Sequence, residues 1–476
     1  MQVFLNKLLE IISNMECLIK NRTRLCYKTC PKTAKFQILQ KSDTLVLQNV
    51  SKMSLVEAKA FTQPMLSMIF KSCCIIFVAR TSNLIVVGVM NITIVCDVLG
   101  EPNNGTSVAA YNLINHLKSQ GHDVRVVCCD ADKKGESGFC IVPTLNLGPI
   151  VNAALARNEV VPAKADPVIL EEAIKDADVV HLLMPFPLSW KAVKICEKYG
   201  VPMTASFHVQ AENFTCHLGM MKSNIATKEV YKYFYKKVYD HCTLTHYPTE
   251  FIKEDFESNI KKHVPSRVIS NGVSESFFEP APLEAIIRQK QKNNKKFTIV
   301  VVGRYSSEKA QQVLIRAVAK SKYKDRIKLI MAGEGPKGRM YRRLVKRNGV
   351  DCEMRFIEHN ELKEVLNAAD LYVHTAYVEL ESIACLEAIV TGLVPIICDS
   401  KRSAARFFAQ DDRCLYRKWD PEDLKNKIEY FMDNPEELNA CKEKYKTQAN
   451  VSRLGECMNK MEEMLQEAAG MREKEA

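Results

Sequence analysis

The feature that most constrains this chain is an alternation of short apolar runs with longer helical patterns, which starts near Met90 and starts again near residue 297. The apolar runs of the first half are 92–95, 124–129, 179–183 and 203–207. Those of the second half are 297–302, 327–332, 354–357, 371–375 and 394–398. Alternating strand and helix signals are typical of parallel sheets with crossover helices. We therefore expect an α/β chain with two Rossmann-like, doubly wound domains, and a ligand site beyond the carboxyl ends of their strands.

The domain boundaries follow from composition. A polar, basic segment at 288–296 separates the two halves of a chain of 476 residues, which is long enough for two or three domains. We expect an extension at 1–89 that is poorly ordered or outside the functional unit. A first domain should follow at 90–290 and a second at 291–447. A helical tail at 448–476 could cross back to the first domain.

Charge and glycine content set the first 89 residues apart. The chain carries 67 Lys and Arg against 56 Asp and Glu, but residues 1–89 hold 12 of the former and 4 of the latter, and no glycine precedes Gly88. The remaining chain is nearly neutral, which argues against a nucleic-acid partner. The apolar stretch 65–89 contains Lys71 and Arg80, so it fits a membrane-spanning helix poorly. We expect Met90 to be the functional start.

The cysteines and histidines exclude two other classes of protein. The 18 cysteines form no CxxC pair and fall largely in apolar runs, as expected for reduced thiols in the cytoplasm. The ten histidines lack the spacing of metal ligands, so we expect no metal site.

The most informative motif is an acidic segment that follows one apolar run and opens a helix. The free N–H groups of a helix N-terminus bind anions, so a diphosphate could rest on the amides near Glu381, Ser382 and Ile383. Glu379 would precede the helix and face the cleft. Glu387 would lie about one and a half turns inside it, where a carboxylate can accept hydrogen bonds from vicinal sugar hydroxyls. The alternative is that these acids cap a solvated helix.

A second motif supplies positive charge. Gly303 ends an apolar run and allows backbone to approach a ligand. Arg304 and Lys309 then place two cations beside the same expected site, which suits a diphosphate. Basic residues after strands are common, so this motif gains weight from the acidic segment.

Two residues of the first half could face the same ligand. His208 ends an apolar run and could donate to a sugar hydroxyl or to developing charge, although a lone histidine is more often structural. Gly105 lies in a turn-rich loop and would permit close approach of a phosphate or acceptor, although it could be a plain turn glycine.

A GxGxxG pattern at 333–338 leaves another activity open. Such a pattern can bind a dinucleotide, and a dinucleotide-dependent oxidoreductase is therefore an alternative function. The pattern follows the second strand of its half, contains Pro336 and leads into a very basic helix. An adjoining turn of a nucleotide-sugar site is the simpler interpretation.

Together these residues resemble the family-4 (group 1) retaining glycosyltransferases with the GT-B fold, from Met90 to the tail. The resemblance rests on the E-x7-E pair Glu379 and Glu387, on the cations after residue 303, and on an Asn-Gly-Val turn at 271–273. It implies that Glu379 contacts the transferred sugar, Glu387 the ribose, and Arg304 and Lys309 the diphosphate. His208 would lie near the sugar and Gly105 in the first loop.

The chain departs from the family pattern at two positions. Many members have glycine where this chain has Ser382, and a smaller or uncharged residue where it has Glu381. The backbone N–H of Ser382 is retained, so phosphate binding survives. The added negative charge of Glu381 would lie near an anionic donor and so affects which donor the site accepts. Alternatively, Glu381 binds another sugar hydroxyl.

The region from 207 to 240 resembles the diacylglycerol glucosyltransferase branch. Its basic, aromatic helix suits an anionic membrane surface, although an ordinary half-packed helix would look similar. The resemblance implies transfer of a hexose, with UDP-glucose favoured as donor, to a hydroxyl acceptor such as diacylglycerol, with retained configuration and no required cofactor. The protein would be cytoplasmic and could bind the inner face of a membrane. A non-catalytic nucleotide-sugar or membrane-binding protein is the remaining alternative.

Overall fold

The computed structural model describes residues 37–41, 44–48, 75–80, 83–97, 99–100, 105–146, 148, 162–211, 224–293, 296–448 and 451–475. The chain divides into two compact units, Met1–Val89 and Met90–Ala476. The described part of the first unit is an antiparallel sheet in the order β1-β2-β3-β4. Its strands are Gln37–Lys41, Thr44–Gln48, Ile75–Arg80 and Asn83–Gly88.

The apolar stretch 65–89 thus contains two paired strands, β3 and β4. Within the described residues, no helix has the length and apolar character needed to cross a bilayer. The expectation that residues 1–89 stand outside the functional unit stays a prediction.

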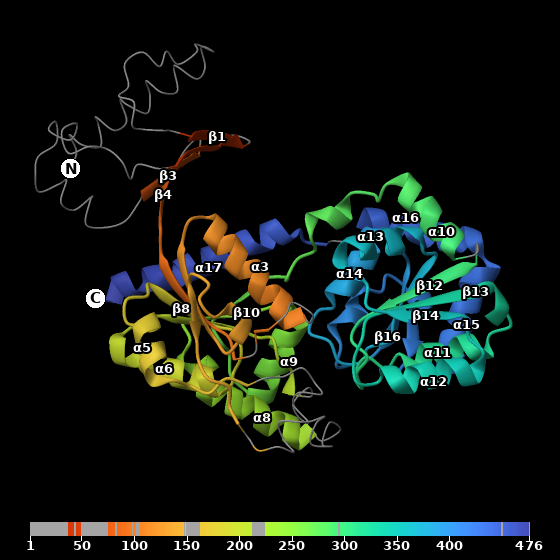
Figure 1. Cartoon of the computed structure of the whole chain (residues 1–476), viewed down its shortest axis with the longest axis horizontal. Helices are drawn as coiled ribbons and strands as arrows, with labels where there is room; N and C mark the ends of the chain where they lie inside the picture. The colour runs from red at the N-terminus through yellow and green to blue at the C-terminus, as the bar shows by residue number, and fades with distance from the viewer. Residues whose placement is uncertain are drawn as a thin grey trace, which may run out of the picture. The chain divides into compact units, whose positions relative to one another are not determined.

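The second unit begins with a parallel sheet of seven strands in the order β11-β10-β9-β8-β5-β6-β7. In chain order these strands are β5 Asn91–Val95, β6 Asp123–Cys128, β7 Phe139–Ile141, β8 Val179–Leu182, β9 Met203–Ser206, β10 Leu244–Tyr247 and β11 Ser266–Val268. The connecting helices are α3 Gly105–Ser119, α5 Pro167–Ile174, α6 Pro187–Tyr199, α8 Asn224–Lys237 and α9 Glu250–Ile260. Figure 1 shows helices packed around these strands.

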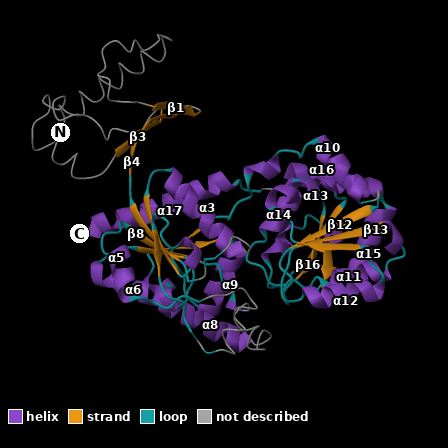
Figure 2. Cartoon of the chain, viewed as in Figure 1, coloured by secondary structure: helices purple, strands orange, loops and turns teal. Residues whose placement is uncertain are grey.

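A second parallel sheet has six strands in the order β14-β13-β12-β15-β16-β17. They are β12 Phe297–Val302, β13 Ile327–Ala332, β14 Cys352–Arg355, β15 Leu371–His374, β16 Pro395–Asp399 and β17 Leu415–Arg417. The helices here are α10 Leu283–Lys292, α11 Gln312–Lys320, α12 Gly338–Asn348, α13 His359–Ala368, α14 Ile383–Val390, α15 Pro421–Asp433 and α16 Pro435–Gln448. Figure 2 shows the strands enclosed by helices.

The last helix, α17 Leu454–Glu475, packs on the first of these two sheets. Its apolar side chains Met458, Met461 and Leu465 are buried in the same core as the strands of that sheet. The carboxylate of Glu462 is 2.9 Å from Nε2 of His116 on α3 and 3.1 Å from Nε2 of His122. We call the part of the second unit built on the seven-stranded sheet the first lobe, and the part built on the six-stranded sheet the second lobe. Helix α17 is therefore part of the packing of the first lobe.

The expected architecture of two Rossmann-like parallel sheets is confirmed. Strands such as β8 and β15 are buried along their whole length, because helices cover both faces of a parallel sheet. The apolar pattern located β12 and β13 to the residue. It missed β7, β10, β11 and β17, which are short strands, and β10 reads Leu-Thr-His-Tyr, with two polar residues in four.

Candidate active site

Two loops meet where neighbouring strands of the second sheet end. Strands β12 and β15 pair in parallel, so their carboxyl ends lie at the same edge. The Thr375 hydroxyl donates to the carbonyl of Lys309 at 2.6 Å, and the N–H of Tyr377 donates to the carbonyl of Glu308 at 3.1 Å. This contact lets the ammonium group of Lys309 donate to the carboxylate of Glu379. The cation and the acid, 70 residues apart in sequence, therefore form one site.

A histidine that the sequence analysis did not select completes this cluster. Nε2 of His374, the last residue of β15, is 3.5 Å from the Glu379 carboxylate. Burial, and then the charge of Lys309, lower the pKa of His374 to about 3, so its ring is neutral at pH 7. Burial alone would lower the pKa of Lys309, but the charge of Glu379, its hydrogen bond to Lys309 and the charge of Glu308 together outweigh burial and raise it. The position of His374 at the end of a buried strand was the available sequence signal.

Gly303 and Arg304 begin the loop that carries Lys309. Gly303 has φ +143°, a conformation that side chains rarely adopt, and a Cβ there would lie 3.7 Å from Cδ of Lys309. Arg304 is partly buried, and its carbonyl accepts a hydrogen bond from Nε2 of Gln311 at 2.9 Å. Its Cγ atom lies near Gly335 of the next loop.

The glycines of the GxGxxG pattern have a packing role. A Cβ at Gly333 would lie 2.3 Å from the carbonyl oxygen of Gly303, and one at Gly335 would lie 2.8 Å from the amide nitrogen of Tyr305. The N–H of Tyr305 donates to the carbonyl of Glu334 at 2.7 Å. The two loops thus approach backbone to backbone, which explains these two glycines without a dinucleotide.

The acidic segment enters α14 through a strained residue. Ser382 precedes the helix with φ +82° and ψ 72°, a region that favours glycine. Its carbonyl accepts from the N–H groups of Cys385 and Leu386 at 3.1 and 3.2 Å, so the helix begins directly after it. Ile383 is the first helical residue, and the amides in the first turn of a helix have no intrahelical acceptor.

Glu381 has different partners from the sugar hydroxyl that we considered. Its carboxylate accepts hydrogen bonds from the Ser270 hydroxyl and from N and Nδ2 of Asn271, the latter two at 3.0 and 2.8 Å. Burial raises its pKa, although these hydrogen bonds oppose the shift. Its observed role is therefore to hold the turn at the end of the first lobe.

Glu387 is almost fully buried within α14. The nearest cation-capable group is Nδ1 of His359, at 3.9 Å from the carboxylate. Burial raises the pKa of Glu387 to about 7. Burial raises the pKa of Tyr372 well above its ordinary value, and the charges of Cys385, Glu379 and Glu387 raise it further.

His208 follows β9 and is buried beside His246, with ring centroids 6.0 Å apart. Burial, and then His246, lower the pKa of His208 to about 3. Nε2 of His246 is 2.6 Å from the carbonyl of Ile269, so this nitrogen carries the proton, and Nδ1 accepts from the Ser206 hydroxyl at 2.9 Å. His208 therefore lies beside a second histidine whose tautomer is set.

Gly105 is the first residue of α3, and among the described residues no atom beyond its chain neighbours lies within 4 Å of a Cβ built on it. Residues 101–104, the rest of the expected loop, lie outside the described residues. Across the described ranges, no group of three or more His, Cys, Asp or Glu side chains could hold a metal ion. The 12 cysteines described are free thiols.

Two family models match successive parts of this chain. The family described as "Glycosyl transferases group 1" matches residues 283–448, and "Glycosyltransferase Family 4" matches residues 103–277. An alpha-monoglucosyldiacylglycerol synthase of Streptococcus pneumoniae is 24% identical over 46% of this chain and 51% of its own length. The chain thus matches about half of that relative.

Other relatives match more of the chain. A GDP-mannose-dependent alpha-mannosyltransferase of Corynebacterium glutamicum is 24% identical over 65% of this chain and 72% of its own length. The crystal structure of Anabaena HepE in complex with UDP-glucose covers 79% of this chain and all of its own, with 14% identity and a TM-score of 0.62. At that identity the likeness shows the fold alone.

Proposed function

Because this chain belongs to the family-4 (group 1) glycosyltransferases, we propose that it moves a hexose from a nucleotide-diphosphate sugar to a hydroxyl acceptor with retention of configuration. The observation that carries this proposal is the ion pair of Lys309 and Glu379 at the edge of the second sheet. A nucleotide-diphosphate sugar needs two groups at its site. One is a cation that its phosphates can reach, and the other is a carboxylate that can accept hydrogen bonds from its sugar.

The donor diphosphate would lie on Lys309, Arg304 and the first amides of α14. Phosphate oxygens would replace Glu379 as the partner of Lys309, and Glu379 could then accept from a sugar hydroxyl. The bond from the anomeric carbon to the diphosphate breaks while a bond to the acceptor oxygen forms on the same face. The acceptor proton passes to a donor phosphate oxygen. The cations and the helix end stabilise the departing diphosphate.

Glu387 fits contact with the ribose. A carboxylate can accept hydrogen bonds from both hydroxyls of a ribose, whereas its protonated form accepts fewer. We favour UDP-glucose as the donor. The name of the streptococcal relative supports glucose as the transferred sugar, and HepE, which shares only its fold with this chain, binds UDP-glucose in its crystal structure. The corynebacterial relative makes GDP-mannose the second candidate.

The proposed acceptor is diacylglycerol at a membrane surface, which α8 would contact. Ile225 and Tyr233 on α8 are 78% and 45% exposed, among exposed lysines that include Lys232 and Lys236. Tyr231 and Phe234 are instead buried in the core, so the aromatic residues divide between packing and surface. Residues 212–223, which precede this helix, lie outside the described residues.

A donor screen tests the proposal. The full chain is titrated with UDP-sugars, GDP-sugars and NAD by thermal shift. Each sugar donor is then incubated with diacylglycerol vesicles while nucleoside diphosphate release is measured. We expect UDP-glucose to raise Tm and to support product formation with an α-linkage, read by NMR. Binding without release with any acceptor would instead indicate a non-catalytic nucleotide-sugar protein. A shift with NAD alone would favour the oxidoreductase.

The membrane contact has its own test. Replacing Ile225 and Tyr233 by serine should weaken sedimentation with anionic vesicles several-fold while soluble donor binding stays unchanged. Equal sedimentation of the variant and the wild type would exclude α8 as the contact. Val168→Ser and Val268→Ser, which change exposed apolar side chains elsewhere in the same lobe, are the matched control.

A further inference from the structure

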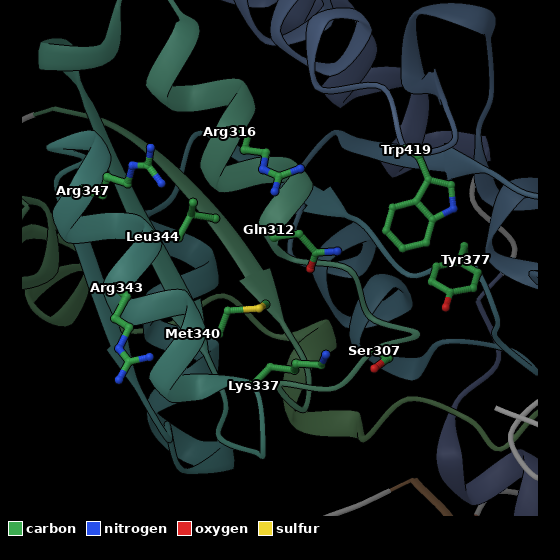
Figure 3. Close-up of a pocket in the computed structure, with 10 residues that line it drawn as sticks. All are labelled: Ser307, Gln312, Arg316, Lys337, Met340, Arg343, Leu344, Arg347, Tyr377 and Trp419. Carbon is green, nitrogen blue, oxygen red and sulfur yellow. The ribbon is translucent and has the colours of Figure 1, made fainter. Parts of the chain in front are cut away.

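A cavity of about 580 Å³ lies in the second lobe, lined mainly by α11 and α12. This volume is in the range of small-molecule sites. Met340, Arg343, Leu344 and Arg347 share one face of α12, because residues three, four and seven apart are neighbours on a helix. Figure 3 shows these side chains with the other residues that line the cavity. None of Arg304, Lys309, Glu379 and Glu387 lines it.

Positive charge is concentrated in this cavity. Arg316 and Lys337 add to the two arginines of α12, which makes four cations around one space. Among the residues that the structure describes, these four form no ion pair with an acid. Arg316, Arg343 and Arg347 are exposed, so an anion entering from solvent can reach their guanidinium groups. Guanidinium groups suit phosphate oxygens in particular, because they donate two parallel hydrogen bonds.

Two aromatic rings complete the lining. Tyr377 and Trp419 have ring centroids 4.8 Å apart, with their planes tilted by 48°. Trp419 is 48% exposed and has φ +64°, which is unfavourable for a residue with a side chain. The surrounding structure therefore holds a large apolar ring in a strained conformation at the edge of a charged cavity. Such a ring offers a stacking face to a planar ligand.

We propose that this cavity binds a small phosphorylated ligand that carries a planar ring, at a site separate from the proposed donor site. The phosphates would contact the four cations, and the ring would lie against Trp419. A lipid headgroup supplies phosphate but no planar ring, so it matches only part of the lining.

The cavity shares two loops with the proposed donor site. Ser307 lines the cavity and lies between Arg304 and Lys309 on one loop. Tyr377 lies two residues before Glu379 on the other, and its N–H donates to the carbonyl of Glu308. A ligand here would therefore contact the loops that hold the Lys309–Glu379 pair, so it could change donor affinity.

Trp419 allows a direct test, because the chain has only two tryptophans. In a Trp190→Phe background, the fluorescence of Trp419 is titrated with ATP and, separately, with inorganic tripolyphosphate. We expect saturable changes with both probes and at least fivefold tighter binding of ATP, since only ATP has a ring. The absence of a saturable change with either probe would overturn the proposal. Equal affinities would overturn the assignment of the ring.

A matched pair of double variants separates a built site from general charge attraction. Arg343→Ala with Arg347→Ala should weaken ATP binding at least tenfold. Arg339→Ala with Lys346→Ala removes the same charge from exposed positions of the same helix that do not line the cavity, and should change affinity less than twofold. Equal losses in the two would refute the site.

A third variant keeps this result separate from the donor site. Lys309→Ala should leave the Trp419 titration within twofold, because Lys309 does not line the cavity. Loss of the signal in Lys309→Ala would mean that the probe binds at the donor site, and would overturn the second site. The fluorescence titration does not depend on the result of the donor screen, so the two proposals can fail separately.

Discussion

Glu381 and Asn271 are joined by two hydrogen bonds, from the backbone N and the Nδ2 atom of Asn271, at 3.0 and 2.8 Å. The two residues lie 110 positions apart, at the end of the first lobe and just before α14. Glu381 therefore connects the turn at 271–273 to the segment that we assign to donor binding. A charge that looked unfavourable beside an anionic donor has its own hydrogen-bonding partners.

Glu381→Gln should destabilise the protein by about 1–3 kcal/mol, because an amide presents an N–H₂ group where a carboxylate oxygen accepted a hydrogen bond. Urea denaturation at pH 7 measures the loss. Glu334→Gln, which alters an exposed side chain on a neighbouring loop, should change stability by less than about 0.5 kcal/mol. Equal stabilities of Glu381→Gln and the wild type would contradict the assigned role.

Lys309→Ala should reduce kcat/KM for transfer by a factor of about 100 or more, because one charged contact to a departing diphosphate is worth about 3 kcal/mol. Lys320→Ala, which removes an exposed lysine of α11, should retain wild-type activity. Circular dichroism checks that both variants fold. Wild-type turnover in Lys309→Ala would refute the donor site. The double variant with Glu379→Ala should lose less than the sum of the two single effects.

Ser382→Gly should stabilise the protein by about 1 kcal/mol, because glycine adopts φ +82° without a steric penalty. Ser382→Ala should not, because alanine retains the Cβ. The measurement is the midpoint of urea unfolding for both variants. A lower midpoint for Ser382→Gly would mean that the contact of the Ser382 hydroxyl with Nδ1 of His374, at 3.4 Å, outweighs the backbone strain.

The raised pKa of Glu387 predicts a pH dependence. Its pKa is about 7 in the folded protein and 4.5 as the ordinary value, so the folded state binds the proton more tightly. The contribution of Glu387 to the free energy of unfolding should therefore fall by roughly 3 kcal/mol as pH rises from about 4.5 to 7. It should not change further at higher pH. Glu387→Gln should lack this component, which urea denaturation at pH 5 and pH 8 measures. Donor affinity should increase over the upper part of the same range, as the carboxylate becomes charged.

Glu462 should behave in the opposite sense. Burial opposes its charge, but hydrogen bonds with His116 and His122 lower its pKa to about 2. The contribution of Glu462 to the free energy of unfolding is complete at pH values above its ordinary pKa of 4.5, and it is lost as pH falls toward 2. Glu462→Gln should cost about 2 kcal/mol at pH 7 and less at pH 3. Glu467 lies on the same helix and forms a more exposed ion pair with Arg267 of β11. Glu467→Gln, which breaks that pair, should cost under about 1 kcal/mol at both pH values.

The sequence was sufficient for the two-sheet architecture, because helix and strand periods are local properties. Strands β12 and β13 are apolar except for one residue each, Thr298 and Lys328, and were located to the residue. A strand such as β10 has two polar side chains in four residues, and these are buried because helices such as α9 and α17 pack against the strand. No local pattern encodes such a strand.

Sequence alone also selected Lys309, Glu379 and Glu387, because the motif places their charges beside expected strand ends and a helix end. Only the tertiary structure decided their partners. It paired Lys309 with Glu379, brought His374 beside them, and gave Glu381 to Asn271, since hydrogen bonds between residues 70 to 110 apart depend on how β12 and β15 pair and how the loops pack. Charge can be read along the chain, whereas distance between charges is a property of the folded backbone.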